Sequence, residues 1–281
     1  MSIINKYNQR VERVNSLVCV GLDSDWGKIP EEYKKLPFPQ FEFNKFIIDE
    51  TQEFASAFKP NSAFYEARGD QGIRELKLTM EYLQEKYPDI VTILDAKRGD
   101  IGNTNQGYID FTFDWLGFDA LTVSPYLGEE SLEPFLNRAD KGIIILCRTS
   151  NPGSGDIQNL LVEGKPLYQV IAEKVAGLKS CHPERSEGSF SNKWNKNNNC
   201  LLVVGATYPE ELKKIREIVG EMTLLVPGIG SQGGDIEVVV KAGLNSQGKG
   251  LIINSSRAII FSENPKQQAK KLKDEINKYR L

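Results

Sequence analysis

Short runs of apolar residues recur along the chain and alternate with segments whose apolar residues are spaced three or four positions apart. The runs are mostly continuous rather than alternating, as in parallel strands that are covered on both faces. Eight such runs are present, at residues 17–23, 55–60, 90–97, 119–125, 142–148, 201–207, 223–229 and 250–256. The pattern therefore predicts eight parallel strands.

Segments with helical spacing fill the gaps between these runs. Helices are expected over residues 41–54, 72–87, 209–219 and 264–279, and a further helix begins at residue 167. Pro209 is expected in the first turn of its helix, where a missing N–H has no intrahelical partner to lose. Eight strand–helix units in 281 residues predict an α/β fold, a single (β/α)8 TIM-barrel domain spanning 1–281. A doubly wound open sheet is the alternative.

One stretch, residues 180–200, departs from this pattern. It is polar and rich in Ser and Asn, and it interrupts the helix that begins at residue 167. We expect a surface insertion here. A metal site formed by Cys181, His182 and Cys200 is the alternative, although three loosely spaced ligands give it weak support.

Composition narrows the class of protein. The 35 Lys and Arg against 38 Asp and Glu give a net charge of −3, so no basic excess points to a nucleic-acid partner. No apolar run reaches the ~18 residues of a membrane span, and the N-terminus is too polar for a signal peptide. Four cysteines without a C-x-x-C motif favour a cytoplasmic protein, with Cys19 and Cys147 as small core residues. The only histidine is His182, so acid–base chemistry is left to Asp, Glu, Lys, Arg or Tyr.

The sharpest candidate site is the motif DAKRGDIGNTN (95–105), at the end of the third predicted strand. Catalytic groups of a barrel stand at the carboxyl ends of its strands. Asp95 and Lys97 are two residues apart and share a face, and Lys59 ends the neighbouring strand. A salt bridge would explain a lone D-x-K motif, but so many charges in a low-dielectric barrel mouth would be a poor source of stability. The cluster therefore favours a functional site that handles charge.

A second candidate site is the glycine-rich loop PGIGSQGGD (227–235), which follows the seventh predicted strand. Glycines let backbone N–H groups approach an anion, and the loops after strands seven and eight form the usual phosphate site of barrels. Arg257 follows the eighth strand and is placed to pair with the same phosphate. A flexible turn and a surface charge are the alternatives, but together these features predict a phosphorylated small-molecule ligand.

Two other strand ends carry hydrogen-bonding side chains. Ser150 lies in the turn sequence TSNPG, which by itself indicates only a turn. Asp23, in VGLD, is placed to accept hydrogen bonds from ribose hydroxyls, and a capping role is equally compatible with its position.

Over nearly its whole length, the chain resembles orotidine 5′-phosphate decarboxylase of the longer bacterial type. The family motif D-x-K-x-x-D is found at Asp95, Lys97 and Asp100, and Ile101 and Thr104 follow it. The segments FKPN (58–61), TVSPYLG (122–128), TSNPG (149–153), VPGIGSQGG (226–234) and NSSRAI (254–259) occur in the order of that family.

The resemblance implies decarboxylation of orotidine 5′-phosphate to UMP and CO2, the last step of de novo pyrimidine nucleotide synthesis, without a metal or organic cofactor. The catalytic residues that it implies are Lys59, Asp95, Lys97 and Asp100, with Lys97 as proton donor. The implied substrate-binding residues are Asp23, Lys59, Ile101, Thr104, Ser150, Pro227, Gln232 and Arg257. It also implies a homodimer in which Asp100, Ile101 and Thr104 complete the partner's site.

Three other functions remain as alternatives. One is a Mg²⁺-dependent sugar-phosphate synthase or decarboxylase, which resembles this chain at the third strand but holds its metal partly with a glutamate on the second. Another is an aldolase that forms a Schiff base through Lys59 or Lys97. The third is a nucleotide-phosphate binder without catalytic activity.

Overall fold

The computed structural model describes residues 2–178, 193–229 and 235–280. Parallel strands close into a barrel in which every strand is hydrogen-bonded to two neighbours, in the order β1-β10-β9-β8-β5-β4-β3-β2. These strands are β1 (Val18–Val20), β2 (Ala55–Phe58), β3 (Val91–Arg98), β4 (Ala120–Val123), β5 (Gly142–Arg148), β8 (Cys200–Val204), β9 (Leu224–Pro227) and β10 (Leu251–Ser255). The eight predicted strands are confirmed, and closure of the sheet excludes the doubly wound alternative.

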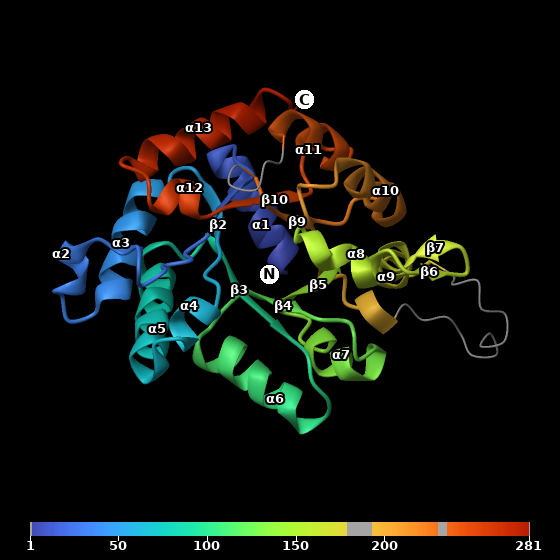
Figure 1. Ribbon diagram of the computed structural model, residues 1–281, viewed down its shortest axis with the longest axis horizontal. Helices are drawn as coiled ribbons and strands as arrows, with labels where there is room; N and C mark the ends of the chain where they lie inside the picture. The colour runs from blue at the N-terminus through green and yellow to red at the C-terminus, as the bar shows by residue number, and fades with distance from the viewer. Residues whose placement is uncertain (1, 179–192, 230–234, 281) are drawn as a thin grey trace.

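Helices surround the barrel (Figure 1). They are α1 (Ile3–Val14), α2 (Glu31–Lys34), α3 (Pro39–Thr51), α4 (Ala63–Glu66), α5 (Gly69–Lys86), α6 (Asn103–Ile109), α7 (Glu129–Leu136), α8 (Gly155–Gln158), α9 (Leu167–Ala176), α10 (Pro209–Val219), α11 (Ile236–Gly243), α12 (Arg257–Ile260) and α13 (Pro265–Asn277). Shorter elements are the π-helical turn η1 (Asp110–Trp115), the 3-10 turns η2 (Pro152–Ser154) and η4 (Lys193–Asn195), and a hairpin of β6 (Leu161–Val162) and β7 (Lys165–Pro166). The expected helices are present, and α10 begins at Pro209 as predicted.

The hydrophobic pattern explains how strands and helices pack. In β5, Ile143, Ile144 and Ile145 are all buried, because one face of the strand points into the barrel and the other lies under helices. In α10, Leu212 and Ile215 form part of the buried face, and the opposite face is polar. Continuous apolar runs in the sequence therefore correspond to strands buried on both faces, and helical spacing corresponds to helices buried on one face.

Helix α1 closes the amino end of the barrel. The Tyr7 hydroxyl donates a hydrogen bond to the carbonyl of Leu251, the first residue of β10. The Arg10 Nε donates to the carbonyl of Ala55, the first residue of β2, at 3.0 Å. Since α1 covers this end, the opening of the barrel lies at the carboxyl ends of the strands.

The predicted surface insertion needs a correction at both ends. Helix α9 already ends at Ala176, because Gly177 adopts a left-handed conformation with φ of 75° and caps it. Trp194 is buried in the core and Cys200 is the first residue of β8, so the surface prediction is wrong for these residues. Residues 180–192, including Cys181 and His182, lie outside the described residues. Cys19 and Cys147 are buried, as expected.

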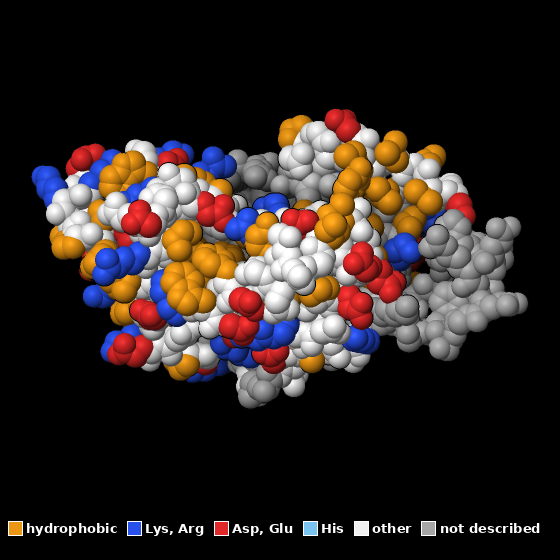
Figure 2. Space-filling view, turned by 90° about the horizontal axis from the view of Figure 1, so that it is seen from below, with side chains coloured by type: hydrophobic (Ala, Val, Ile, Leu, Met, Phe, Trp, Pro, Cys, Tyr) orange, Lys and Arg blue, Asp and Glu red, His pale blue; other side chains and the backbone are white. Residues whose placement is uncertain are grey.

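Two surface properties bear on possible partners. Within the described ranges, none of the helices combines the length and apolar character that a membrane crossing requires. Figure 2 shows acidic and basic side chains interspersed over the face it presents, without a large patch of one sign.

Candidate active site

The carboxyl ends of the strands surround a cavity of about 480 Å³. Its two sides differ in chemistry. Charged and amide side chains from the ends of β1, β2 and β3 line one side, whereas Leu146 of β5, Val203 of β8 and Leu225 of β9 line the other. The cavity thus places an apolar wall opposite a row of charges.

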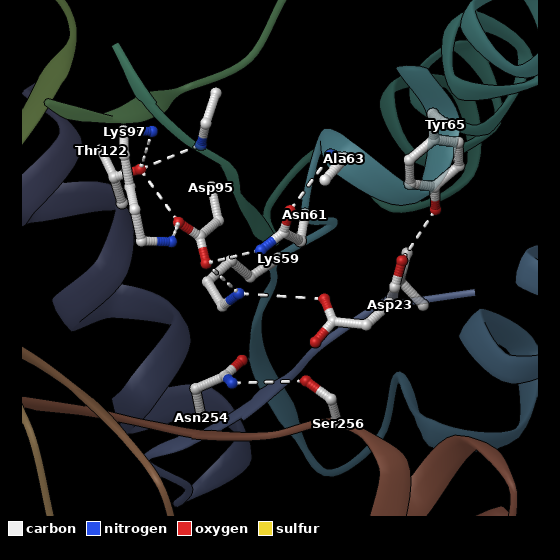
Figure 3. Close-up of polar contacts among 12 residues, drawn as sticks. Asp23, Lys59, Asn61, Ala63, Tyr65, Asp95, Lys97, Thr122, Asn254 and Ser256 are labelled. Carbon is white, nitrogen blue, oxygen red and sulfur yellow. Dashed lines mark hydrogen bonds and ion pairs between the residues drawn. The ribbon is translucent and has the colours of Figure 1, made fainter. Parts of the chain in front are cut away.

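The charged side chains form an alternating row along three adjacent strand ends (Figure 3). The Lys59 Nζ lies 2.9 Å from Asp95 Oδ2, and the Lys97 Nζ lies 2.7 Å from Asp95 Oδ1. Asp23 extends the row, with its Oδ1 4.0 Å from Lys59 Nζ. The structure therefore confirms the predicted cluster of Lys59, Asp95 and Lys97 and adds Asp23 to it.

The central pair of this row is ionised, with Lys59 buried and Asp95 only 14% exposed. Burial alone would lower the pKa of Lys59, but the carboxylates of Asp95 and Asp23 reverse this effect and raise the pKa above its usual range. Burial alone would raise the pKa of Asp95, but the ammonium groups of Lys59 and Lys97 hold it well below its usual range. Each charge thus stabilises the ionised form of its neighbour.

Lys97 differs from Lys59 in its environment. Only 3% of the Lys59 side chain is exposed, against 49% of the Lys97 side chain. The expectation that both lysines lie in a low-dielectric mouth is therefore correct for Lys59 and wrong for Lys97 within a single chain. Lys97 lines the cavity, and a hydrogen bond to Asp95 holds its ammonium in position.

A bulge in β3 places these two groups. Leu94 pairs with Leu121 and Arg98 pairs with Val123, so three residues of β3 lie opposite the single residue Thr122 of β4. The Thr122 Oγ1 accepts hydrogen bonds from the backbone N–H groups of residues 96 and 97, at 3.0 and 2.9 Å, and donates one to Asp95 Oδ1. Lys97 has a φ of 49°, a left-handed conformation that is uncommon for a residue other than glycine. The shared face is therefore built by this bulge rather than by regular strand alternation.

Other predicted site residues line the same cavity. Ser150 follows β5, Pro227 ends β9 and Arg257 begins α12. Arg257 and Pro227 lie at the ends of neighbouring strands, because β10 pairs with β9, and their role in binding phosphate stays a prediction. Gln232 lies outside the described residues.

Asp100, Ile101 and Thr104 are not among the described residues that line this cavity. The Asp100 carbonyl accepts hydrogen bonds from Asn105 and Ser131, which fix the backbone after β3. Ile101 is 59% exposed. One chain alone therefore assembles three of the four predicted catalytic residues, and the role of Asp100 in a partner's site stays a prediction.

Arg148 holds the loop that carries Ser150, because its Nη1 donates hydrogen bonds to Ser154 Oγ and Gln158 Oε1. The pairing of β5 with β8 shifts by one residue before Arg148, and this shift turns its side chain away from the cavity. Arg148 is buried outside the cavity and pairs there with Glu211 of α10. Its guanidinium lies 4.0 Å from the centre of the Tyr208 ring. A Cβ on Gly205 would lie 2.8 Å from Ser150 Cα, so Ser150 has little space in which to move.

Sequence reasoning missed several polar residues that line the cavity. Asn61 donates to Asp95 Oδ2 at 3.4 Å, and Thr122 organises the bulge. Asn254 is buried in β10, and no hydrogen-bond partner among the described residues reaches its Oδ1. A sequence signal existed for Asn254, because it is a lone amide at the end of an apolar strand. Among the described residues, no group of three or more His, Cys, Asp or Glu side chains is placed to hold a metal ion.

Comparisons with known proteins agree with this geometry. The family model described as Orotidine 5'-phosphate decarboxylase / HUMPS family matches residues 16–272. An orotidine 5′-phosphate decarboxylase of Janthinobacterium sp. (strain Marseille) is 44% identical, over 99% of this chain and 99% of its own. One of Cellvibrio japonicus is 46% identical, over 94% of this chain and 91% of its own. The solved OMP decarboxylase of Leishmania donovani has a TM-score of 0.85 at 38% identity, covering 100% of this chain and 99% of its own.

The family match covers both the fold and the cavity. It extends from two residues before β1 into α13, and includes every strand that contributes to the charged row. The chain therefore belongs to the orotidine 5′-phosphate decarboxylase / HUMPS family.

Proposed function

We propose that this chain converts orotidine 5′-phosphate into UMP and CO2, the last step of de novo pyrimidine nucleotide synthesis. Its similarity to orotidine 5′-phosphate decarboxylases extends over nearly the whole chain. The observation that carries the proposal is the Lys59–Asp95–Lys97 row in a cavity that Arg257 also lines. The reaction breaks the bond between C6 of the pyrimidine and its carboxylate carbon, so the protein is a carbon–carbon lyase.

Lys97 is the proton donor. When CO2 leaves, the electron pair of the broken bond remains on C6, where no adjacent electron sink exists. A fixed ammonium at this carbon stabilises the developing negative charge and then supplies a proton. Lys97 suits this role because its ammonium reaches the cavity while a 2.7 Å contact with Asp95 fixes its direction.

Asp95 and Lys59 support this chemistry. The ionised Asp95 lies beside the departing substrate carboxylate, and repulsion between the two anions raises the free energy of the bound substrate. The repulsion ends when neutral CO2 forms. Lys59 keeps Asp95 ionised, because their 2.9 Å contact favours the charged form of both groups.

The remaining cavity residues bind the nucleotide. Arg257, together with Gln232, binds the 5′-phosphate. Asp23 and Lys59 bind ribose hydroxyls, and Ser150 binds the pyrimidine edge. Pro227 lines the pocket. Phosphate binding far from C6 supplies binding energy that organises the reacting groups.

The working unit is a homodimer in which Asp100, Ile101 and Thr104 enter the partner's site. Two adjacent loops, after β3 and β4, support this arrangement, because they expose the apolar side chains of Ile101, Tyr126 and Leu127. Mixing and refolding inactive Lys97→Ala and Asp100→Ala proteins should restore activity, since one site of each hybrid dimer is then intact. Failure of the mixture to recover any activity would contradict a shared site.

The geometry disfavours a Mg²⁺-dependent enzyme and an aldolase that acts through Lys59. A divalent cation bound to Asp95 would face the Lys59 ammonium, which already occupies one carboxylate oxygen. A Schiff-base lysine must lose its proton to act as a nucleophile, whereas neighbouring carboxylates raise the pKa of Lys59. A cytoplasmic location is part of the same proposal.

The test is to follow the loss of orotidine 5′-phosphate absorbance with purified protein and EDTA present throughout. Rapid formation of UMP is the expected result, with Lys97→Ala protein prepared in the same way as the control. Absence of turnover by folded protein would refute the proposal. Turnover of a sugar phosphate that EDTA abolishes would instead support the Mg²⁺-dependent relatives.

A further inference from the structure

A network of buried polar side chains lies directly behind Asp23, outside the active-site cavity. It connects α3, α4 and α5, which lie side by side, to the segment that follows β1 (Figure 1). Its six fully buried members are Ser24, Gln40, Asn44, Tyr65, Glu75 and Thr79. Polar groups are buried at such density only when they are hydrogen-bonded, so each contact of this network is informative.

Tyr65 and Asn44 form the centre of the network. The Tyr65 hydroxyl donates to the carbonyl of Leu22 at 2.8 Å and accepts from Asn44 Nδ2 at 2.9 Å. The Asn44 Oδ1 accepts from the Ser24 hydroxyl, and its other Nδ2 proton goes to Thr79 at 3.0 Å. Because the tyrosine hydroxyl has one proton to donate, these contacts admit a single orientation of the Asn44 amide.

Gln40 holds the same segment from a second direction. Its Nε2 donates to the carbonyls of Ser24 and Phe64, at 2.8 and 2.9 Å. Its Oε1 accepts from Arg68, which also pairs with the buried carboxylate of Glu75 at 2.7 Å. An ion pair therefore anchors the outer end of the network.

These contacts restrain the two residues that flank Asp23. The carbonyl of Leu22 is held by Tyr65, and both the hydroxyl and the carbonyl of Ser24 are held by α3. Asp23 itself is left with a buried Oδ1 that no hydrogen-bond donor among the described residues reaches, 4.0 Å from Lys59 Nζ (Figure 3). The backbone is thus fixed on both sides of a carboxylate that lines the cavity and is 19% exposed.

We infer that Tyr65 and Asn44 are positioning residues for substrate binding, which hold Asp23 where its carboxylate accepts a hydrogen bond from a ribose hydroxyl. This inference rests on the proposed function, since it takes the ligand to be a ribonucleotide. A hydrogen bond to a buried carboxylate depends on distance and angle, so a small displacement of residues 22–24 weakens it. Neither side chain is among the described residues that line the cavity, so their effect on binding must pass through Asp23.

The experiment is a double-mutant cycle on UMP binding, measured by calorimetry with the full chain. Tyr65→Phe removes the hydroxyl that holds Leu22, and we expect it to weaken UMP binding about fivefold. In an Asp23→Asn background the same substitution should have almost no further effect. Ser24→Ala breaks the contact with Asn44 and serves as a second probe if Tyr65→Phe protein does not fold.

Tyr7→Phe is the matched control. Tyr7 is also fully buried, and its hydroxyl donates to a strand carbonyl, that of Leu251, and accepts from Ser56. It lies at the amino end of the barrel, far from the cavity. We expect it to lower the temperature of unfolding while leaving UMP affinity unchanged.

The outcomes separate this inference from the proposal on which it rests. Wild-type protein that does not bind UMP would overturn both. Wild-type protein that binds UMP, with a Tyr65→Phe effect of equal size in both backgrounds, would overturn the positioning role alone. An equal loss of affinity in Tyr7→Phe would do the same, because it would show that general destabilisation is the cause.

Discussion

Replacing Lys59 by methionine tests whether the buried ion pair stabilises the folded barrel as well as the site. Methionine has a similar length and no charge, so the substitution leaves Asp95 in place with one lysine instead of two. The Asp95 carboxylate keeps its contacts with Lys97 at 2.7 Å, Thr122 at 3.1 Å and Asn61 at 3.4 Å. It loses the 2.9 Å contact with the ammonium of Lys59.

The size of the effect can be bounded from this geometry. Two unit charges 2.9 Å apart attract by about 6 kcal/mol at an effective dielectric constant of 20. Desolvation of the two groups offsets part of this attraction, and removing one partner of a buried pair typically destabilises by about 3–5 kcal/mol. Because Lys97 still neutralises Asp95, we expect Lys59→Met to lower the free energy of unfolding by about 3 kcal/mol.

The shifted pKa values of Asp95 and Lys59 determine how this loss of stability depends on pH. The lowered pKa of Asp95 means that its contribution is present above the ordinary aspartate pKa, about 3.9, and is lost as the pH falls below it. The raised pKa of Lys59 means that its contribution is present below the ordinary lysine pKa, about 10.4, and is lost at higher pH. The difference between wild type and variant should therefore be constant between about pH 5 and pH 9.

Urea unfolding at pH 5, 7 and 9 measures this difference. Lys241→Met is the matched control, because Lys241 pairs with Glu237 on the exposed surface of α11 and its loss should leave stability unchanged. A Lys59→Met variant that unfolds with nearly the wild-type free energy would refute the reasoning. The reasoning would also be refuted if the difference in stability between wild type and variant disappeared as the pH fell from 7 to 5, since Asp95 would then titrate near neutrality.

Three further substitutions test individual roles. Lys97→Ala should lower kcat at least about a hundredfold with an unchanged circular dichroism spectrum; retention of a tenth of kcat would exclude Lys97 as proton donor. Arg257→Ala should raise KM about 10- to 100-fold, because a charge-assisted contact to phosphate is lost; an unchanged KM in steady-state assays would remove it from the phosphate site. Gly205→Ala should raise KM by displacing Ser150, whereas Gly107→Ala, with nothing within 4 Å of the added Cβ, should not; equal effects of the two variants would contradict the close fit.

Much of the architecture could be predicted because it depends on local spacing. The eight apolar runs predict the strands to within a few residues, and Pro209 marks the start of α10. Chain order then places polar residues at the carboxyl ends of consecutive strands, which meet at one mouth in a closed parallel barrel. The end of α9 was not predicted correctly, because a single residue, Gly177, ends the helix before the polar stretch begins.

The site itself depends on contacts that local spacing does not encode. Regular alternation correctly predicted that Asp95 and Lys97 share a cavity, but the actual cause is a bulge held by Thr122, 27 residues away from Asp95. The same limitation applies to Arg148, which strand alternation would point into the cavity and which a pairing shift turns toward Glu211.

The sequence alone therefore determined the number of strands, the barrel and, apart from Asp100, the charged residues at its mouth, because hydrophobic period and chain order are local properties. Only the tertiary structure decided that Lys59 is buried while Lys97 is half exposed, and that Tyr65 and Asn44 restrain Asp23 from behind. Burial and hydrogen-bond partners arise from side chains that are distant in sequence, and they appear only when the packing of the whole chain is known.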